Sequence, residues 1–152
     1  IQGGSSGTDR PEIRGVNGQF RLLSGADTGA LQFQYPRNWI APDGRVFGYD
    51  SNGRVYYVNT AGTGSISQRG QLLPTANRGS DATAVMFRPG RILQAGGASN
   101  GAVVIDIRGA SPTFAATQSM GSQRRLANAT VLADGKVVVT GGSSVWNQMT
   151  NV

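Results

Sequence analysis

Hydrophobic residues in this chain fall in short runs that are separated by glycine-containing turns. Val103–Ile107 and Val137–Val139 are nearly continuous apolar runs, and Asp-Gly, Pro-Gly and Asn-Gly pairs punctuate the sequence. Such runs predict β-strands, and the continuous ones predict strands that are covered on both faces. No window of about ten residues has helical spacing, and no apolar run approaches the roughly 20 residues of a membrane span. We therefore expect an all-β protein without a membrane-spanning segment.

Two sequence markers recur along the chain at nearly the same interval. The turn glycines Gly44, Gly90 and Gly135 lie 46 and 45 residues apart, each between two apolar runs. A second marker, Ser-Asn-Gly, occurs at 51–53 and again at 99–101. A repeat of about 40–50 residues with several short strands in each unit is typical of a β-propeller blade.

The repeat divides the chain into about two complete four-stranded blades flanked by two partial blades. The predicted segments are the end of a preceding blade with a connector (1–34), one blade (35–76), a second blade (77–121) and the first half of a further blade (122–152). The predicted third and outer strands are Arg54–Asn59, Ser65–Leu72, Ala102–Ile107 and Thr113–Ser119, with Gln19–Leu23 as the outer strand of the preceding blade. Because an unclosed array leaves apolar faces and strand edges bare, we expect this chain to be part of a larger propeller.

Glycine pairs end the second strand of two repeats, at Gly96-Gly97 and Gly141-Gly142. Asp43-Gly44 and Asp134-Gly135 stand at the tight turns, where glycine supplies the left-handed backbone conformation that a hairpin needs. We expect the two aspartates to form turns rather than an acid/base pair. We expect the glycine pairs to lie where the inner strands crowd the propeller axis and leave no room for a Cβ.

Composition narrows the chemistry that this chain can perform. It contains no histidine and no cysteine, which removes the commonest metal ligand, the usual general base and any thiolate. The net charge of +6 is carried almost wholly by scattered arginines, with only Arg124 and Arg125 adjacent. Because no basic run exists, we expect no nucleic-acid partner. The first residues, Ile1–Gly7, have no features of a signal peptide, so we expect either a removed leader or a start within a longer protein.

Two stretches resemble the kelch-type propeller of the galactose oxidase and glyoxal oxidase family. They are Tyr-Pro-Arg-Asn-Trp-Ile-Ala-Pro-Asp-Gly-Arg-Val-Phe-Gly at 35–48 and the segment 124–142. Members of that family are secreted copper-radical oxidases. The resemblance implies that the full-length parent is extracellular and oxidises a primary alcohol or aldehyde with O₂, giving hydrogen peroxide.

The resemblance also implies a cofactor that this chain cannot hold alone. Family members bind copper through two tyrosines and two histidines, and one tyrosine is cross-linked to a cysteine as the radical cofactor. None of these can be placed here, so they are expected upstream of Ile1 and downstream of Val152 in the parent. We expect no catalytic residue, no metal and no cofactor in this chain. Its expected partners are the remaining blades, from the same or a cleaved chain, and a small alcohol, aldehyde or carbohydrate substrate.

Segments that enter the innermost strand of each blade reach the central funnel first, and they supply the candidate substrate-pocket residues. Tyr35 and Arg37 stand where the family places a substrate-contacting Tyr-Arg element. Arg78 and Asp81 enter the second blade, and Arg124, Arg125 and Leu126 enter the third. Leu126 stands where galactose oxidase has an aromatic wall, which argues against a hexose preference. The alternative for the arginines is pairing with carboxylates between blades. Trp39 and Trp146 are expected to pack within the blades rather than to form sugar platforms.

Two other functions stay open at the level of the sequence. The first is a non-catalytic kelch module that binds protein or glycan or serves as a scaffold. The second is binding of a polyanion through the arginines, which predicts a steep dependence of affinity on salt.

Overall fold

The computed structural model describes residues 9–32 and 34–146, and its regular structure consists of antiparallel β-strands and one short 3₁₀ turn. The all-β prediction is therefore confirmed. The chain forms two compact units, Ile1–Leu72 and Leu73–Val152. In the described part of the chain, no helix has the length and hydropathy needed to cross a membrane.

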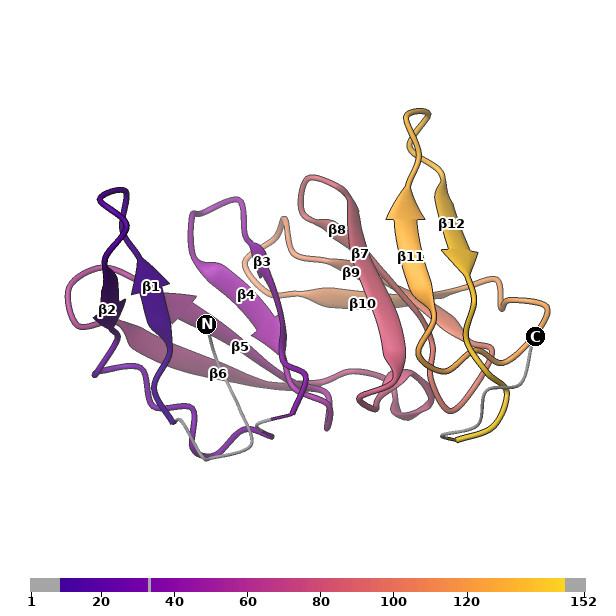
Figure 1. Ribbon diagram of the computed structural model, residues 1–152, viewed down its shortest axis with the longest axis horizontal. Helices are drawn as coiled ribbons and strands as arrows, with labels where there is room; N and C mark the ends of the chain where they lie inside the picture. The colour runs from indigo at the N-terminus through magenta and orange to yellow at the C-terminus, as the bar shows by residue number, and fades with distance from the viewer. Residues whose placement is uncertain (1–8, 33, 147–152) are drawn as a thin grey trace. The chain divides into compact units, whose positions relative to one another are not determined.

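The first unit contains a two-stranded sheet and a four-stranded sheet (Figure 1). The two-stranded sheet pairs β1 (Glu12–Arg14) with β2 (Phe20–Leu22). The four-stranded sheet has the order β3-β4-β5-β6, so that each strand pairs with its neighbour in sequence. Its strands are β3 (Arg37–Ile40), β4 (Val46–Tyr49), β5 (Arg54–Asn59) and β6 (Ser65–Leu72).

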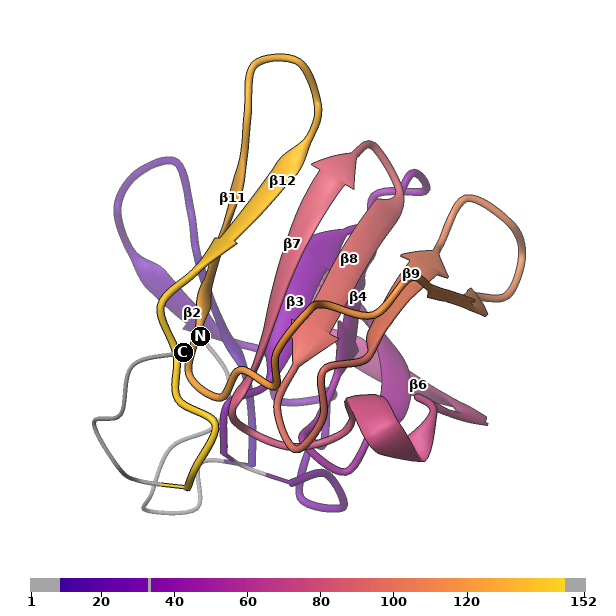
Figure 2. The same cartoon turned by 90° about the vertical axis from the view of Figure 1, so that its right-hand side faces the viewer.

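The second unit repeats this plan in the opposite sequence order, with its four-stranded sheet first. That sheet has the order β10-β9-β8-β7, and a 3₁₀ turn, η1 (Thr75–Asn77), precedes it. A two-stranded sheet of β11 and β12 follows, and Figure 2 shows this hairpin beside β7. The strands are β7 (Ala82–Arg88), β8 (Arg91–Gly96), β9 (Ala102–Asp106), β10 (Thr113–Thr117), β11 (Asn128–Val131) and β12 (Val137–Thr140).

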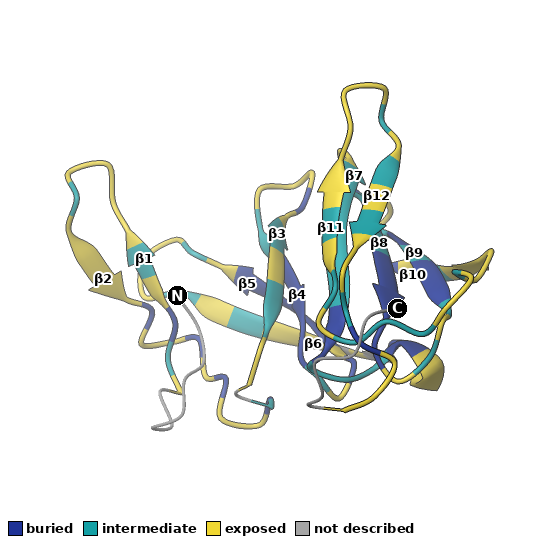
Figure 3. Ribbon diagram, turned by 45° about the vertical axis from the view of Figure 1, so that its right-hand side comes forward, coloured by how far each residue is buried: buried dark blue, intermediate teal, exposed yellow. Residues whose placement is uncertain are grey.

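The predicted strands and the observed ones agree closely where the apolar pattern is strong. The ranges of β5 and β6 match the prediction, whereas β9 and β10 end one and two residues earlier. The short strand β1 was not predicted, because three residues with a proline before them carry no alternation to detect. β8 and β9 are largely buried, and β11 and β12 are half-buried or exposed (Figure 3).

The turn residues behave as the sequence predicted. Gly44 and Gly135 have φ of +82° and +80°, which glycine adopts without a steric penalty. Asp43 accepts a hydrogen bond from the Arg45 backbone N–H at 3.0 Å, and Asp134 accepts one from the Lys136 N–H at 3.1 Å. Both carboxylates therefore stabilise a turn.

The core of the first unit joins the connector to the sheet. Leu23, Ala26 and Leu31 pack with Tyr56 and Val58 of β5. A buried carboxylate fixes the same connector: Asp50, 1% exposed, accepts hydrogen bonds from the backbone N–H groups of Gln32 and Arg54, both at 2.8 Å. A buried charge that accepts two such bonds is compensated, so Asp50 acts as a structural residue.

Candidate functional site

The segment that enters β11 contacts the entry of β7 and the end of β8 in the second unit. The Arg124 carbonyl accepts a hydrogen bond from the Gly97 N–H at 2.7 Å, and the Leu126 N–H donates to the Asp81 carbonyl at 2.7 Å. Arg125 exchanges two backbone hydrogen bonds with Ser143, at 2.8 and 2.9 Å. Four of the predicted pocket residues, Asp81 and 124–126, are thereby brought together.

Arg125 and Asp81 form an ion pair in the middle of this group. Nη1 of Arg125 donates to Oδ2 of Asp81 at 2.5 Å, and the two side chains are 20% and 5% exposed. The Arg125 guanidinium also lies 5.7 Å from the centre of the Trp146 ring. Pairing with a carboxylate, the alternative considered for the arginines, is what the structure shows for Arg125.

The two glycine pairs explain how this segment approaches so closely. A Cβ on Gly96 would overlap the carbonyl oxygen of Arg124, and a Cβ on Gly142 would lie 2.8 Å from the carbonyl oxygen of Arg125. The expectation that no side chain fits is confirmed for Gly96 and Gly142, where the neighbour is the entry segment of β11. Crowding of inner strands at a propeller axis stays a prediction. Gly141 differs, because nothing lies within 4 Å of its Cβ position; its φ of +68° is what favours glycine there.

Arg124 and Leu126 add a charged and an apolar side chain to the segment that enters β11. Arg124 is half-buried, and its Nη1 donates to the Gly141 carbonyl at 2.6 Å. Leu126 has φ of +56°, a conformation that is costly for a leucine, and its side chain is 66% exposed. Leu126 therefore exposes an apolar side chain on the segment that also carries Arg124, and the hydrogen bond of its backbone N–H to the Asp81 carbonyl holds this residue in place.

Arg78 lies on the connector rather than in the ion-paired group. It follows η1, and its Nε donates to the Leu73 carbonyl at 2.7 Å. This contact is local, five residues apart in sequence, and it stabilises the connector.

Tyr35 and Arg37 lie at the corresponding entry in the first unit. Tyr35 is 67% exposed and has φ of +53°, two residues before β3, just as Leu126 stands two residues before β11. Neither tyrosine nor leucine favours this backbone conformation, which asparagine and glycine adopt far more readily. The sequence alone therefore does not predict it at these positions. Backbone strain at exposed positions is a common feature of functional sites.

Arg37 faces an aromatic cluster. Its guanidinium lies 6.0 Å from the ring of Tyr49, and burial raises the pKa of that phenol well above its ordinary value, so the phenol stays neutral. Trp39 packs against the rings of Phe47 and Tyr49 at centroid distances of 6.4 and 5.6 Å. Trp39 is therefore a packing aromatic, as expected.

The chain does not offer a copper-radical site. It has no histidine and no cysteine, and in residues 9–32 and 34–146 no group of three or more acidic side chains could hold a metal ion. Carboxylate oxygens also suit hard cations better than redox copper. The donors present do not fit the cofactor that the family resemblance implies.

The fold and this entry-segment geometry can be compared with known proteins. No family model matches the chain, and no curated protein matches it by sequence. Among solved structures, a fungal alcohol oxidase of the AA5 family, in complex with copper, matches with a TM-score of 0.80 and 23% identity, over 93% of this chain and 34% of that one. The resemblance to the galactose oxidase-like family is thus confirmed as a similarity of fold. The chain spans about a third of the length of that oxidase.

Proposed function

We propose that this chain is part of the β-propeller of a galactose oxidase-like copper-radical oxidase. The observation that carries the proposal is the similarity of 93% of the chain to a copper-bound alcohol oxidase, at a TM-score of 0.80. The 45-residue repeat and the two four-stranded sheets support the finer plan of two blades at 35–76 and 77–121 with partial blades at 1–34 and 122–152.

In this proposal the chain shapes the substrate pocket and does not carry the redox centre. The copper and its radical cofactor would be held by other parts of the parent, and they would supply the two-electron oxidation of a primary alcohol or aldehyde hydrate, with O₂ reduced to hydrogen peroxide. Arg124 offers guanidinium donors to a hydroxyl or carbonyl oxygen, and Leu126 offers an apolar contact. Tyr35 and Arg37 serve the same purpose at the other entry. Arg125 and Asp81 act as positioning residues, because each is committed to the other.

The test is peroxide release by the recombinant full-length parent and its variants, supplied with a primary alcohol and O₂. Arg124→Ala should raise KM about tenfold, the loss of one hydrogen bond to a charged donor. The matched control is Arg45→Ala, since Arg45 pairs with Asp43 at a hairpin turn and lies away from the entry segments. Peroxide release that Arg124→Ala leaves unchanged would remove Arg124 from the pocket; no peroxide from any primary alcohol or aldehyde would argue against the oxidase.

A non-catalytic propeller module is the second candidate function. The observation that favours it is the donor set: this sequence holds neither histidine nor cysteine. A parent that releases no peroxide, holds no copper and binds a glycan or protein would establish it. Polyanion binding is less well supported, because five described arginines lie within ion-pair distance of aspartates, namely Arg10, Arg45, Arg91, Arg108 and Arg125.

A further inference from the structure

Strand β10 forms an outer edge of the second four-stranded sheet. This sheet has the order β10-β9-β8-β7, and in the described residues no strand pairs with the other side of β10. Four of its five residues are exposed, and Phe114 is half-buried. The backbone N–H and C=O groups on the free side of such a strand can pair with a further strand. The edge belongs to a sheet of four strands, the full number of a propeller blade, so it does not arise from where the sequence begins or ends.

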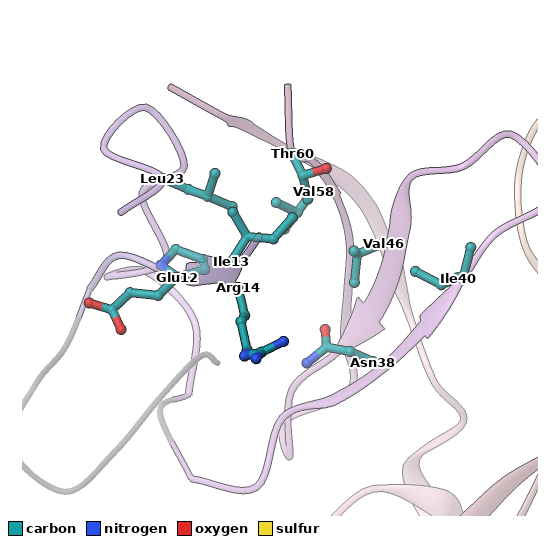
Figure 4. Close-up of a pocket in the computed structure, with 10 residues that line it drawn as sticks. Glu12, Ile13, Arg14, Leu23, Asn38, Ile40, Val46, Val58 and Thr60 are labelled. Atoms are coloured by element: carbon teal, nitrogen blue, oxygen red, sulfur yellow. The ribbon is translucent and has the colours of Figure 1, made fainter. Parts of the chain in front are cut away.

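The open groove beside β1 has a different origin. It has a volume of about 340 Å³ and lies between β1 and the sheet formed by β3, β4 and β5, with walls that include Ile13, Ile40, Val46 and Val58 (Figure 4). In the proposed parent, further strands of the preceding blade would continue the β1–β2 sheet and cover this groove. The four-stranded plan of a blade has no corresponding strand for the outer edge of β10.

Strands β2 and β6 are also edge strands that end their sheets in chain order, and each has a feature that opposes pairing. β2 has three residues and includes the exposed Arg21. β6 shifts its register against β5 between Arg54 and Tyr56, and its Gly70 has φ of +66°. Short strands, charged residues and bulges are features by which natural sheets protect their edges. β10 differs, because its five residues are uncharged and pair with β9 without a shift.

The sequence of β10 is complementary to itself. Thr-Phe-Ala-Ala-Thr at 113–117 is nearly palindromic about Ala115. Two copies can lie antiparallel about a two-fold axis through Ala115, so that Thr113 of one copy faces Thr117 of the other. Phe114 then faces Ala116, and Ala115 faces its own counterpart. Threonine pairs can hydrogen-bond across strands, and the large phenylalanine ring faces a small side chain, so each pair is compatible with a close antiparallel contact.

Charge also favours a second copy at this edge. The chain has a net charge of +6, so two copies repel one another on average, but residues 109–123 contain no charged side chain. Like charges that face one another destabilise a strand pair, and none would meet here. We propose that β10 pairs antiparallel with β10 of a second copy. The order β7-β8-β9-β10 in one copy is then continued by β10-β9-β8-β7 in the other, and main-chain hydrogen bonds between the two edges supply the affinity.

This contact is isologous, because the same strand of each copy makes it, and it therefore closes as a dimer. It goes beyond the proposed function, since it concerns assembly and does not rest on copper or on oxidase activity. A monomer that releases peroxide would contradict the dimer alone, and a dimer that releases none would contradict the oxidase alone.

The test is sedimentation velocity of the recombinant full-length parent over a range of concentrations, because the parent supplies the strands that continue this sequence. We expect a reversible equilibrium between monomer and dimer, with nothing larger. Ala115→Lys places two like charges opposite one another at the axis, and it should raise the dissociation constant at least about tenfold. The control is Ala61→Lys, the same change at an exposed residue after β5, and it should leave the dimer unchanged. Because Ala115 and Ala61 are both exposed, each variant should keep its far-ultraviolet circular dichroism spectrum.

Ala115→Asp gives the sharpest comparison. Alone it should weaken the dimer as Ala115→Lys does, whereas an equimolar mixture of the two variants places opposite charges across the axis and should restore a dimer with one copy of each. A higher salt concentration should weaken this mixed dimer and leave the original dimer unchanged, since the original edge is uncharged. If either variant does not fold, Thr113→Lys mixed with Thr117→Asp takes their place, because these two positions also face one another.

Three outcomes would overturn the proposal. The first is a parent that stays monomeric at every concentration. The second is association that Ala115→Lys and Ala115→Asp leave unchanged, which would assign it to another surface. The third is a mixture of the two variants that remains monomeric although each keeps its circular dichroism spectrum.

Discussion

Arg125 and Asp81 form an ion pair across 44 residues of sequence, with Nη1 and Oδ2 2.5 Å apart. The same two positions are linked through the backbone, because the residue after Arg125 donates its N–H to the Asp81 carbonyl. The pair therefore fixes the entry of β11 against the entry of β7. It holds in place the half-buried Arg124 and the exposed Leu126, which we assign to the substrate pocket.

Breaking this pair should destabilise the protein. Asp81→Asn keeps the backbone contact and the shape of the side chain but leaves a largely buried guanidinium without its counter-charge. We expect the free energy of unfolding in urea to fall by about 2–3 kcal/mol, less than for a fully buried pair because a fifth of Arg125 is exposed. Asp134→Asn is the control: its pair with Lys136 is exposed and screened by solvent, so the loss should be clearly smaller than for Asp81→Asn.

A double-mutant cycle separates the pair from its surroundings. Asp81→Asn and Arg125→Gln together should destabilise less than the sum of the single changes, with a coupling energy of about 1–3 kcal/mol. Additive effects would show that the two side chains do not stabilise one another, and Arg125 would then be available to a ligand.

Gly96 and Gly135 allow steric overlap to be measured apart from backbone strain. Both have positive φ, +75° and +80°, so alanine at either position costs about 1–2 kcal/mol. Only at Gly96 does the added Cβ meet the Arg124 carbonyl, which should add about 1–3 kcal/mol. Urea unfolding should therefore rank Gly96→Ala as clearly more destabilising than Gly135→Ala. Equal losses would show that the entry segment is not packed against β8.

Replacing Leu126 with glycine should not lower the free energy of unfolding. Leu126→Gly removes about 1–2 kcal/mol of left-handed strain, which offsets the roughly 0.5–1 kcal/mol that glycine costs through the unfolded chain. Because the side chain is 66% exposed, little burial is lost, and the unfolding free energy should be unchanged or slightly higher. Leu132→Gly, also at an exposed leucine but without positive φ, should lose about 1 kcal/mol. If Leu126→Gly lowers the free energy of unfolding as much as Leu132→Gly does, the backbone strain that we assign to Leu126 is contradicted.

The lowered pKa of Asp106 predicts that the free energy of unfolding depends on pH. The side chain and backbone N–H of Arg108 lower the pKa of this carboxyl to about 2, against an ordinary value of about 3.9. A depressed pKa contributes stability that is present above about pH 4 and is lost as the pH falls through about 2. Asp106→Asn should therefore be less stable than the original chain at pH 6, by at most about 1 kcal/mol, and equally stable near pH 2. A difference that widens on acidification would contradict this assignment.

The sequence predicted the features that repeat and that rest on strong local preferences. Asp-Gly turns predicted the hairpins at Gly44 and Gly135, and continuous apolar runs predicted β9 and β12, because turn chemistry and burial act over a few residues. The expected cover on both faces is not seen for β12, which is half-buried or exposed in the described residues. The lack of room for a side chain was predicted correctly at Gly96, but the neighbour that fills the space, the Arg124 carbonyl, was not predicted.

The structural features that the sequence did not predict depend on contacts between residues that are distant in sequence. Nothing local shows that Arg125 pairs with Asp81, since an arginine at a blade entry has the same sequence appearance whether it binds a ligand or a carboxylate. The left-handed backbone at Tyr35 and Leu126 runs against the preference of both residue types. At Leu126 a backbone hydrogen bond to the Asp81 carbonyl supports it. Strand β1 owes its existence to pairing with β2 rather than to its own three residues.

The intact mass of the native polypeptide under denaturing conditions, together with copper quantification on the native sample, tests the central claim most directly. The proposed function predicts a mass well above 15.8 kDa and about one copper ion per chain, because this sequence has no donors for that metal and the parent must supply them. A mass of 15.8 kDa without copper and without a larger co-purifying chain would contradict the oxidase and leave a binding or structural piece of a propeller.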